Sequence, residues 1–277
     1  MSSFSRDALP CRKSASRHVH LRFHEGLMPS FDKQVVLITG GGAGIGLAAA
    51  VAFAREGAHV VITGRREAAL AAIAQSVPGV SYVVADAGNA ADAARTVDAV
   101  IARCGRLDVL VNNAGAGAIL PLSSASFEAI SAIFAVNTLG PSLLASAALP
   151  HLTRVRGSIV NVSSTYGHKA AALLSHYAAS KAALEHMTRC WALELAPAGV
   201  RVNAVAAGPT ETEFLSERMS LSTAQVDAIK AQERERIPLG RRGEPEDVAA
   251  WIVAMASPQA AWMTGQVVTV DGGLDAT

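Results

Sequence analysis

Tyr177 and Lys181 are the residues whose types and spacing point most directly to chemistry. They stand four positions apart in an alanine-rich stretch that favours a helix, so both side chains share one face. A free tyrosine has a pKa near ~10, poorly matched to acid–base work at neutral pH, and a nearby ammonium lowers that pKa by favouring the phenolate. Taken alone the pair is a weak signal, because any helix can carry a solvent-facing tyrosine and lysine at this spacing.

A glycine-rich segment, Thr39-Gly40-Gly41-Gly42-Ala43-Gly44-Ile45-Gly46, separates a short apolar run from a helical one. A turn whose backbone approaches a pyrophosphate has no room for side chains. The helix that follows offers free amides and a partial positive charge to an anion. The spacing is not G-x-G-x-x-G, and the glycines that fit a phosphate-binding motif are Gly40, Gly44 and Gly46. A turn that is glycine-rich for packing alone is the competing interpretation.

The second predicted strand ends in Thr63-Gly64-Arg65-Arg66, and this ending bears on the choice of cofactor. Sheets of this kind that prefer NAD carry an acid here, which binds the adenosine ribose hydroxyls. Gly64 occupies that position, and the guanidinium of Arg65 suits a 2′-phosphate. We expect NADP(H) to be preferred, with NAD(H) as the alternative. The competing interpretation is a solvated arginine pair at the start of a helix.

From residue 35 onward, short β-branched runs alternate with longer alanine-rich segments. This alternation predicts an α/β, single-domain, doubly wound Rossmann fold with about seven parallel strands and helices on both faces. Such a sheet binds its ligand at the carboxyl ends of its strands. The polar segment 213–240 is a candidate lid. The predicted strands are Val35–Thr39, His59–Thr63, Val80–Ala85, Val109–Asn112, Ser158–Val162, Arg201–Ala204 and Val267–Val270, and the predicted helices lie near 44–56, 66–76, 90–104, 126–149, 175–196 and 245–256.

These motifs together make the chain similar to the short-chain dehydrogenase/reductase family over about residues 31–274. The glycine segment 39–46 matches the family's T-G-x-x-x-G-x-G, and Tyr177 with Lys181 matches its Y-x-x-x-K. Ser164 stands thirteen residues before Tyr177, which is the family's serine-to-tyrosine spacing. Further matches are Asp86, Asn112-Asn113-Ala114-Gly115, Asn137 in Asn137-Thr138-Leu139-Gly140, Pro245–Ala249, Thr264-Gly265-Gln266 and Asp271-Gly272-Gly273, the last three resembling 3-oxoacyl-carrier-protein reductases.

The resemblance implies hydride exchange between carbon four of a nicotinamide and a carbonyl or secondary-alcohol carbon. It implies that Tyr177 gives and takes the proton and that Ser164 hydrogen-bonds the reacting oxygen. It also implies that Lys181 binds the nicotinamide ribose and lowers the tyrosine pKa, while Asn137 holds a water in a proton relay. No metal is implied, and the implied cofactor-binding residues are Gly40, Gly44, Ile45, Gly46, Arg65, Asp86, Asn113, Ala114, Gly115, Tyr177, Lys181, Gly208, Thr210 and Thr212.

Several residues near these motifs keep more than one interpretation. Ser163 becomes the serine candidate if the register is shifted by one residue, and Asn137 can also be a helix-interior amide bonded to backbone. His168 and His176 flank the site in sequence but are interpreted as surface or packing residues. The loop after the sixth strand departs from the family pattern, because Ala207 stands where the family often has proline.

Composition excludes some classes of partner and location. The formal net charge is +1, which argues against nucleic acid or an anionic membrane surface, since these select a concentrated basic face. The widely spaced Cys11, Cys104 and Cys190 predict neither a disulfide framework nor a metal site, and favour a reducing cytoplasm. No run of ~18 apolar residues predicts a membrane helix. Residues 1–27 are expected to form a disordered extension, and residues 28–277 a dinucleotide-binding and catalytic domain.

Three functional classes compete. They are an NAD(P)-dependent carbonyl reductase or alcohol dehydrogenase, a non-catalytic dinucleotide-binding regulator, and a lyase-like relative that has lost the phosphate loop. Intact Ser164, Tyr177 and Lys181 favour the enzyme, and the intact glycines oppose the lyase-like relative. The apolar segment 170–174 favours a small apolar carbonyl compound as substrate. Because family members pair through the helix of the tyrosine and lysine, we expect a homodimer or homotetramer.

Overall fold

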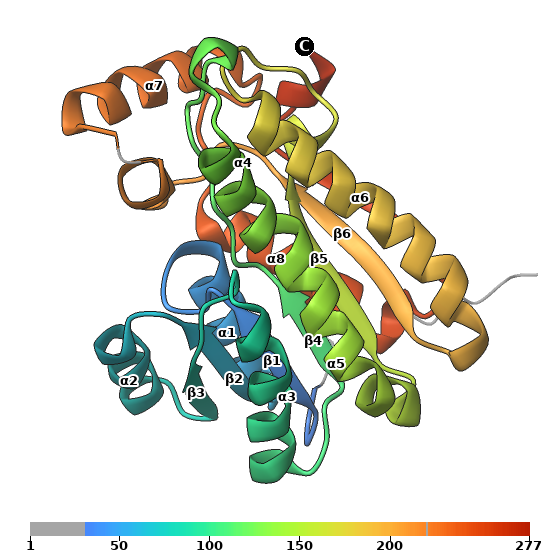
Figure 1. Ribbon diagram of the computed structural model, residues 1–277. Helices are drawn as coiled ribbons and strands as arrows, with labels where there is room; N and C mark the ends of the chain where they lie inside the picture. The colour runs from blue at the N-terminus through green and yellow to red at the C-terminus, as the bar shows by residue number, and fades with distance from the viewer. Residues whose placement is uncertain (1–30, 220) are drawn as a thin grey trace, which may run out of the picture.

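The computed structural model describes residues 31–219 and 221–277, so the predicted extension 1–27 lies outside the described residues. Within them, seven strands form one sheet in the order β3-β2-β1-β4-β5-β6-β7 (Figure 1). Every neighbouring pair of strands is parallel. The chain moves outward in one direction from β1 to β3 and in the other from β4 to β7. The switch point between β1 and β4 is where a doubly wound sheet binds its ligand, and the predicted fold class is confirmed.

The strands follow the predicted runs closely. Three of them, β1 (Val35–Thr39), β4 (Val109–Asn112) and β7 (Val267–Val270), have the predicted bounds. Two central strands run on beyond the prediction, and in their last pair Ser164 lies opposite Ala207. This extension carries the backbone of Ser164 to the ligand-binding edge. The remaining strands are β2 (His59–Gly64), β3 (Val80–Val84), β5 (Ser158–Ser164) and β6 (Arg201–Ala207).

Helices cover both faces of the sheet (Figure 1). The side chains of β1 alternate between two buried clusters, with Val36 and Ile38 facing one way and Val35 and Leu37 the other. A central strand buried on both faces reads as a continuous apolar run, which is why periodicity located it. One face is covered by α1 (Gly44–Arg55) and α8 (Pro245–Ala256), with α2 (Glu67–Ser76) beside the outer strands, and the other by α3 (Ala90–Cys104), α5 (Gly140–Val155) and α6 (Ser175–Leu195).

The helix predicted at 126–149 is longer and contains an irregular turn. It comprises α4 (Phe127–Phe134), a π-helical turn (Ala135–Leu139) and α5, which continues past Pro150. This 29-residue span has a mean hydropathy of 1.5 and could cross a membrane by length and composition alone, contrary to the expectation that no such run exists. In the fold it packs against α3, β4 and α6, as a helix covering a sheet does.

The segment 213–240, expected to be irregular, contains a helix that was missed. A π-helical turn (Phe214–Arg218) leads to α7 (Thr223–Arg236), which projects beside the ligand-binding end of the sheet (Figure 1). None of its residues is buried, so hydrophobic periodicity carried no signal. Its start is a capping box in which Ser222 and Gln225 bond each other's backbone amides, a sequence pattern that could have located the helix.

Candidate active site

The strand ends open into one cleft of about 830 Å³, a volume typical of small-molecule sites. The glycine turn after β1 and the end of β2 line one end of the cleft. The start of α6, the end of β5 and the loop after β6 line the other. Apart from Gly46 and Asn137, every predicted site residue lines this cleft: Gly40, Gly44, Ile45, Arg65, Asp86, Asn113, Ala114, Gly115, Ser164, Tyr177, Lys181, Gly208, Thr210 and Thr212.

The backbone of the glycine turn could hold a diphosphate. Gly44 has φ +52°, a left-handed conformation that favours glycine. Gly46 does not line the cleft, and a Cβ there would overlap the side-chain amide of Asn113 and the carbonyl oxygen of Gly40. The N-cap of α1, Ala43, makes no side-chain cap bond, so the first helical amides are not satisfied by a capping side chain. The cradle therefore fits a dinucleotide diphosphate, and one glycine serves packing.

Thr39 and Asn113 join the end of β1 to the end of β4. The Thr39 hydroxyl accepts hydrogen bonds from the backbone amides of Asn113 and Ala114, both at 3.0 Å. In return, Nδ2 of Asn113 donates to the carbonyl oxygens of Thr39 at 2.9 Å and Gly40 at 3.3 Å. The Asn113 side chain is therefore engaged in holding the glycine turn in place.

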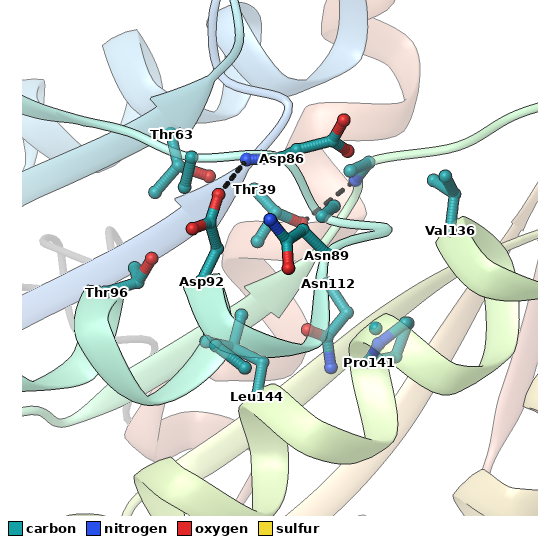
Figure 2. A pocket seen from close by; sticks show the side chains of 15 residues that line it. Thr39, Thr63, Asp86, Asn89, Asp92, Thr96, Asn112, Val136, Pro141 and Leu144 are labelled. Atoms are coloured by element: carbon teal, nitrogen blue, oxygen red, sulfur yellow. Dashed lines mark hydrogen bonds between the residues drawn. The ribbon is translucent and has the colours of Figure 1, made fainter.

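At the end of the cleft that is predicted to bind adenosine, Nη1 of Arg65 lies 4.0 Å from Oδ2 of Asp86. Asp92 accepts the backbone amide of Asp86 at 2.7 Å and so fixes its backbone (Figure 2). The neighbouring Arg66 forms an ion pair with Glu217 at 2.6 Å, which joins the start of α2 to the turn before α7. This contact was missed, because nothing in the sequence links positions 151 residues apart.

Tyr177 lies in the first turn of α6, where its ring packs against Phe214 at a centroid distance of 6.1 Å. The side chain of Ser164 lies close enough to its hydroxyl to stabilise the phenolate and act to lower the pKa of Tyr177. Successive side chains of a strand point to opposite faces, and accordingly Ser163 points away and donates to Oε1 of Glu185 at 2.8 Å. Ser164 is therefore the serine that faces the tyrosine.

Burial controls the proton affinities of Tyr177 and Lys181. It raises the pKa of Tyr177, although the hydrogen bond from Ser164 acts in the opposite direction. It lowers the pKa of Lys181 to about 8, opposed by the charge of Glu185. Burial dominates the pKa of Tyr177, so the prediction that Lys181 lowers this pKa stays a prediction. The Lys181 ammonium donates to the carbonyl oxygen of Val162 at 2.8 Å.

Asn137 lies in the π-helical turn between α4 and α5 and is fully buried. Its Oδ1 accepts the amide of Ala116 at 2.8 Å, while Nδ2 donates to the Ala116 carbonyl at 2.8 Å and to Oγ of Ser180 at 2.9 Å. Both amide hydrogens are thus engaged within the protein. The side chain ties the loop after β4 to α6, which agrees with the interpretation of a backbone-bonding amide.

Comparison with known proteins identifies the family. A family model described as enoyl-(acyl carrier protein) reductase matches residues 40–275. A 3-oxoacyl-[acyl-carrier-protein] reductase of Thermotoga maritima is 40% identical, covering 88% of this chain and 98% of its own. L-fucose dehydrogenase of Bos taurus is 37% identical, covering 87% and 89%. The crystal structure of a 3-ketoacyl-(acyl-carrier-protein) reductase from Brucella melitensis, complexed with NADH, is 33% identical with a TM-score of 0.82, covering 89% and 100%.

The chain belongs to the short-chain dehydrogenase/reductase family. It is an NAD(P)-dependent oxidoreductase that acts on CH–OH or C=O groups. The predicted family and enzyme class are confirmed. Within the described part of this short-chain dehydrogenase/reductase, no three His, Cys, Asp or Glu side chains are grouped so that they could hold a metal ion.

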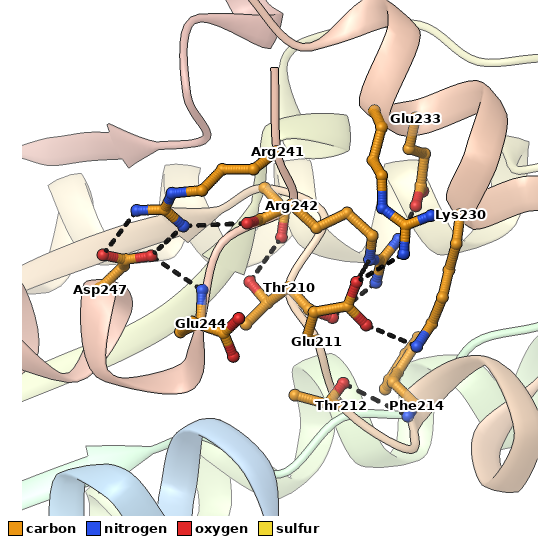
Figure 3. Close-up of polar contacts among 12 residues, drawn as sticks. Thr210, Glu211, Thr212, Phe214, Lys230, Glu233, Arg241, Arg242, Glu244 and Asp247 are labelled. Atoms are coloured by element: carbon orange, nitrogen blue, oxygen red, sulfur yellow. Dashed lines mark hydrogen bonds and ion pairs between the residues drawn. The ribbon is translucent and has the colours of Figure 1, made fainter. Parts of the chain in front are cut away.

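In this short-chain dehydrogenase/reductase, the buried side chain of Arg242 contacts both α7 and the loop after β6 (Figure 3). Arg242 donates to the carbonyl oxygen of Thr210 at 2.6 Å and pairs with Glu211 at 3.2 Å and with Glu233 of α7. Lys230 of α7 also pairs with Glu211, at 2.5 Å. Arg242 and Glu233 both line the cleft. Sequence reasoning missed them, because an arginine in a polar loop is normally exposed.

Proposed function

We propose that this enzyme transfers a hydride between NADP(H) and a small carbonyl or secondary-alcohol substrate, with Tyr177 as the proton donor and acceptor. The observation that carries the proposal is that Ser164, Tyr177 and Lys181 line the same cleft as the glycine turn. The nicotinamide, when bound, supplies or accepts the hydride. The protein's own residues bind, orient and move the proton.

In the reducing direction, Tyr177 gives its proton to the substrate oxygen. Its raised pKa supports this role, because the phenol stays protonated and available at neutral pH. The Ser164 hydroxyl, already beside the phenol, donates to the same oxygen and stabilises the negative charge that develops there. Oxidation of an alcohol needs the phenolate, so its rate should rise with pH.

Lys181 and Asn137 support the tyrosine in this proposal. Lys181 binds the nicotinamide ribose, which its position on the cleft wall supports. Asn137 takes part in the proton relay and keeps the loop after β4 against α6 through its bonds to Ala116 and Ser180. Gly115 lies beside both residues, because a Cβ there would be 3.7 Å from Oδ1 of Asn137 and 3.8 Å from Nζ of Lys181, in ordinary van der Waals contact.

The preference for NADP(H) is a proposal about the exposed end of the cleft. Arg65 lines that end, and a guanidinium can bind a 2′-phosphate through forked donors. The Brucella melitensis relative is complexed with NADH, which keeps NAD(H) as the alternative. Fluorescence titration with NADPH and with NADH decides between them, and tighter binding of NADH would reject the preference.

We further propose an apolar carbonyl compound as substrate. Phe214, Leu215 and Met219 line the cleft and support an apolar substrate, whereas the segment 170–174, expected to contribute, does not line it. A panel of ketones and secondary alcohols, followed by NADPH absorbance, tests the activity, with Tyr177→Phe as the matched variant. Turnover of none of these compounds with either cofactor, or equal turnover by the variant, would reject the proposal.

Assembly and location are also proposals. We propose residues 28–277 as the catalytic domain of a cytoplasmic homodimer or homotetramer that pairs through α6 and the neighbouring α5. Exposed leucines on these helices, Leu143 and Leu193, support such pairing. Sedimentation equilibrium of the protein and of Leu143→Glu tests it: the variant should shift toward monomer, and a monomeric wild-type protein would reject the assembly.

A further inference from the structure

We propose that Glu185 is a positioning residue for Lys181: its buried carboxylate, held by Ser163 and His168, supplies the negative charge that keeps Lys181 an ammonium in the cleft. This inference rests on the proposed role of Lys181 in binding the cofactor. Neither the motifs nor the proposed mechanism uses Glu185, which in sequence looks like an ordinary solvent-facing acid on a helix.

Glu185 follows Lys181 by one helical turn, so the two side chains lie on the same face of α6. Both are buried, with Glu185 3% and Lys181 4% exposed. A lysine and a glutamate are almost never this buried unless each has a partner. Lys181 bonds Val162 and Glu185 bonds Ser163 and His168, so no direct ion pair joins the two charges. They lie one helical turn apart inside the protein, between α6 and the end of β5, where low hydration lets one charge act on the other.

The carboxylate of Glu185 is held by hydrogen-bonding groups from outside its own helix. Oγ of Ser163, on β5, donates to Oε1 at 2.8 Å. Nδ1 of His168 lies 3.1 Å from Oε1 and 3.3 Å from Oε2. Gly167 makes room for the carboxylate, because a Cβ there would overlap Oε1. The carboxylate is thus fixed in position rather than merely enclosed.

The surroundings of the pair identify the groups that can affect its charge. Tyr177 lies on the cleft side, one turn before Lys181. On the far side, Nε2 of His168 lies 3.3 Å from Oγ1 of Thr269 and 3.4 Å from Oδ2 of Asp275. The hydrogen bond from the Lys181 ammonium goes to a neutral carbonyl oxygen, that of Val162. A neutral acceptor cannot replace the charge of a carboxylate.

The physical reason for the arrangement is the cost of burying a cation. Burial lowers the pKa of Lys181 to about 8, close to working pH, and the negative charge of Glu185 raises it. Replacing Glu185 by a neutral side chain leaves the desolvation unopposed. The ammonium would then lose its proton at a lower pH, and the lysine would be partly neutral at pH 7.

The test is the pH dependence of NADPH affinity, measured by fluorescence titration of wild-type protein and of Glu185→Gln. Wild-type affinity should fall with a midpoint near pH 8, and the midpoint of Glu185→Gln should lie about one unit lower, a tenfold change in the ratio of ammonium to amine. The two proteins should bind nearly equally at pH ~6, and their difference should grow to about fivefold at the wild-type midpoint and approach tenfold at higher pH. The pH profile of kcat/KM should shift in the same direction.

Matched variants distinguish the effect of the negative charge of Glu185 from a structural effect of replacing its side chain. Glu185→Asp retains the charge and should keep the wild-type midpoint, as should Asp275→Asn, which removes the carboxylate beyond His168. An unshifted midpoint in Glu185→Gln, or weakening by the same factor at every pH, would overturn the proposal. If Glu185→Gln does not fold, Glu185→Met removes the same charge and is judged by the same midpoint.

Lys181→Met distinguishes failure of this inference from failure of the proposed function. If Lys181→Met binds NADPH as tightly as wild type, the lysine does not bind the cofactor, and both the proposed role and this inference fall. If Lys181→Met weakens binding while Glu185→Gln leaves the midpoint unchanged, the proposed function stands and only the role of Glu185 is overturned.

Discussion

The two ends of the cleft differ in solvent exposure. The residues proposed for proton transfer are buried, whereas those proposed to select the cofactor are exposed. At the end proposed to be catalytic, Tyr177 is 8% and Lys181 4% exposed. At the end proposed to bind adenosine, the side chains of Arg65 and Asp86 are 61% and 44% exposed. Loss of hydration at the first end changes proton affinities and strengthens each polar contact. Water at the second end screens each charge, so single contacts there contribute little.

The sheet explains why the ends differ. β5 has two strands, β6 and β7, between it and the edge of the sheet and is covered on one face by α6, while Phe214 packs on Tyr177. β2 ends near the edge of the sheet, with only β3 beyond it. A residue at the end of β2 therefore remains accessible to solvent. Substitutions should accordingly have large effects at the buried end and small ones at the exposed end.

The largest expected effect is that of Tyr177→Phe. It removes one hydroxyl and should lower kcat by about 10²- to 10⁴-fold, because proton transfer by a positioned side chain contributes that much. NADPH affinity should change by less than about twofold, since the binding surface is retained. Initial rates and fluorescence titration measure the two quantities. Undiminished kcat would show that the proton comes from another group.

The neighbouring residues Ser163 and Ser164 allow the same substitution, serine to alanine, to be compared at two adjacent positions. Ser164→Ala should lower kcat by about 10²- to 10³-fold, as loss of a donor to a developing oxyanion does. Ser163→Ala should lower it by less than about tenfold, because Ser163 bonds Glu185 rather than facing the tyrosine. Steady-state rates compare them. A larger loss in Ser163→Ala would reverse the assignment of the catalytic serine.

A titration of the cofactor-free protein tests the proton affinity at the buried end. The chain has three tyrosines, so the difference in tyrosinate absorbance between wild type and Tyr177→Phe isolates one of them. The midpoint should lie above 10, because burial raises this pKa. The contribution of the Tyr177 hydroxyl to the free energy of unfolding is then fully present below its pKa in the unfolded state. It is lost as pH rises through its pKa in the folded state. A midpoint below 10 would instead support the expectation from the sequence that Lys181 lowers the pKa of Tyr177.

A moderate effect is expected from Arg65→Ala at the exposed end. NADPH affinity should fall by about five- to tenfold, less than for a buried charge-assisted contact because solvent screens the guanidinium. NADH affinity should change by less than about twofold, since NADH lacks the 2′-phosphate. Titrations at low and high salt compare the two cofactors, and the NADPH difference should shrink with salt. Equal losses for both cofactors would contradict a phosphate-binding role.

The smallest effect is expected from Glu217→Gln, which removes the ion pair of Arg66 with the turn before α7. Because the pair is exposed, the free energy of unfolding should fall by less than about 1 kcal/mol. Urea denaturation measures this, and Lys230→Met gives a comparison at the less exposed Glu211 pair. A loss of several kcal/mol in Glu217→Gln would mean that the two ends of the cleft do not differ as described.

Local signals explain most of what could be predicted. The runs of β1 and β4 were located to the residue because these strands are buried on both faces and mainly apolar. β7, an edge strand whose residues are only partly buried, was located by its β-branched run. The glycine turn was found because its spacing is imposed by backbone geometry. By contrast, α7 has no buried face, and the π-helical turn at Asn137 interrupts a helix without any change in apolar pattern. Both therefore escaped an analysis based on periodicity.

By itself, the sequence determined the order of strands and helices, the glycine turn and the spacing of Ser164, Tyr177 and Lys181, since each depends on neighbours in the chain. Only the tertiary structure decided that Ser164 faces Tyr177, that Arg66 meets Glu217, and that the tyrosine pKa is raised. These depend on which distant segments exclude water from a side chain, and desolvation has no local pattern in a sequence.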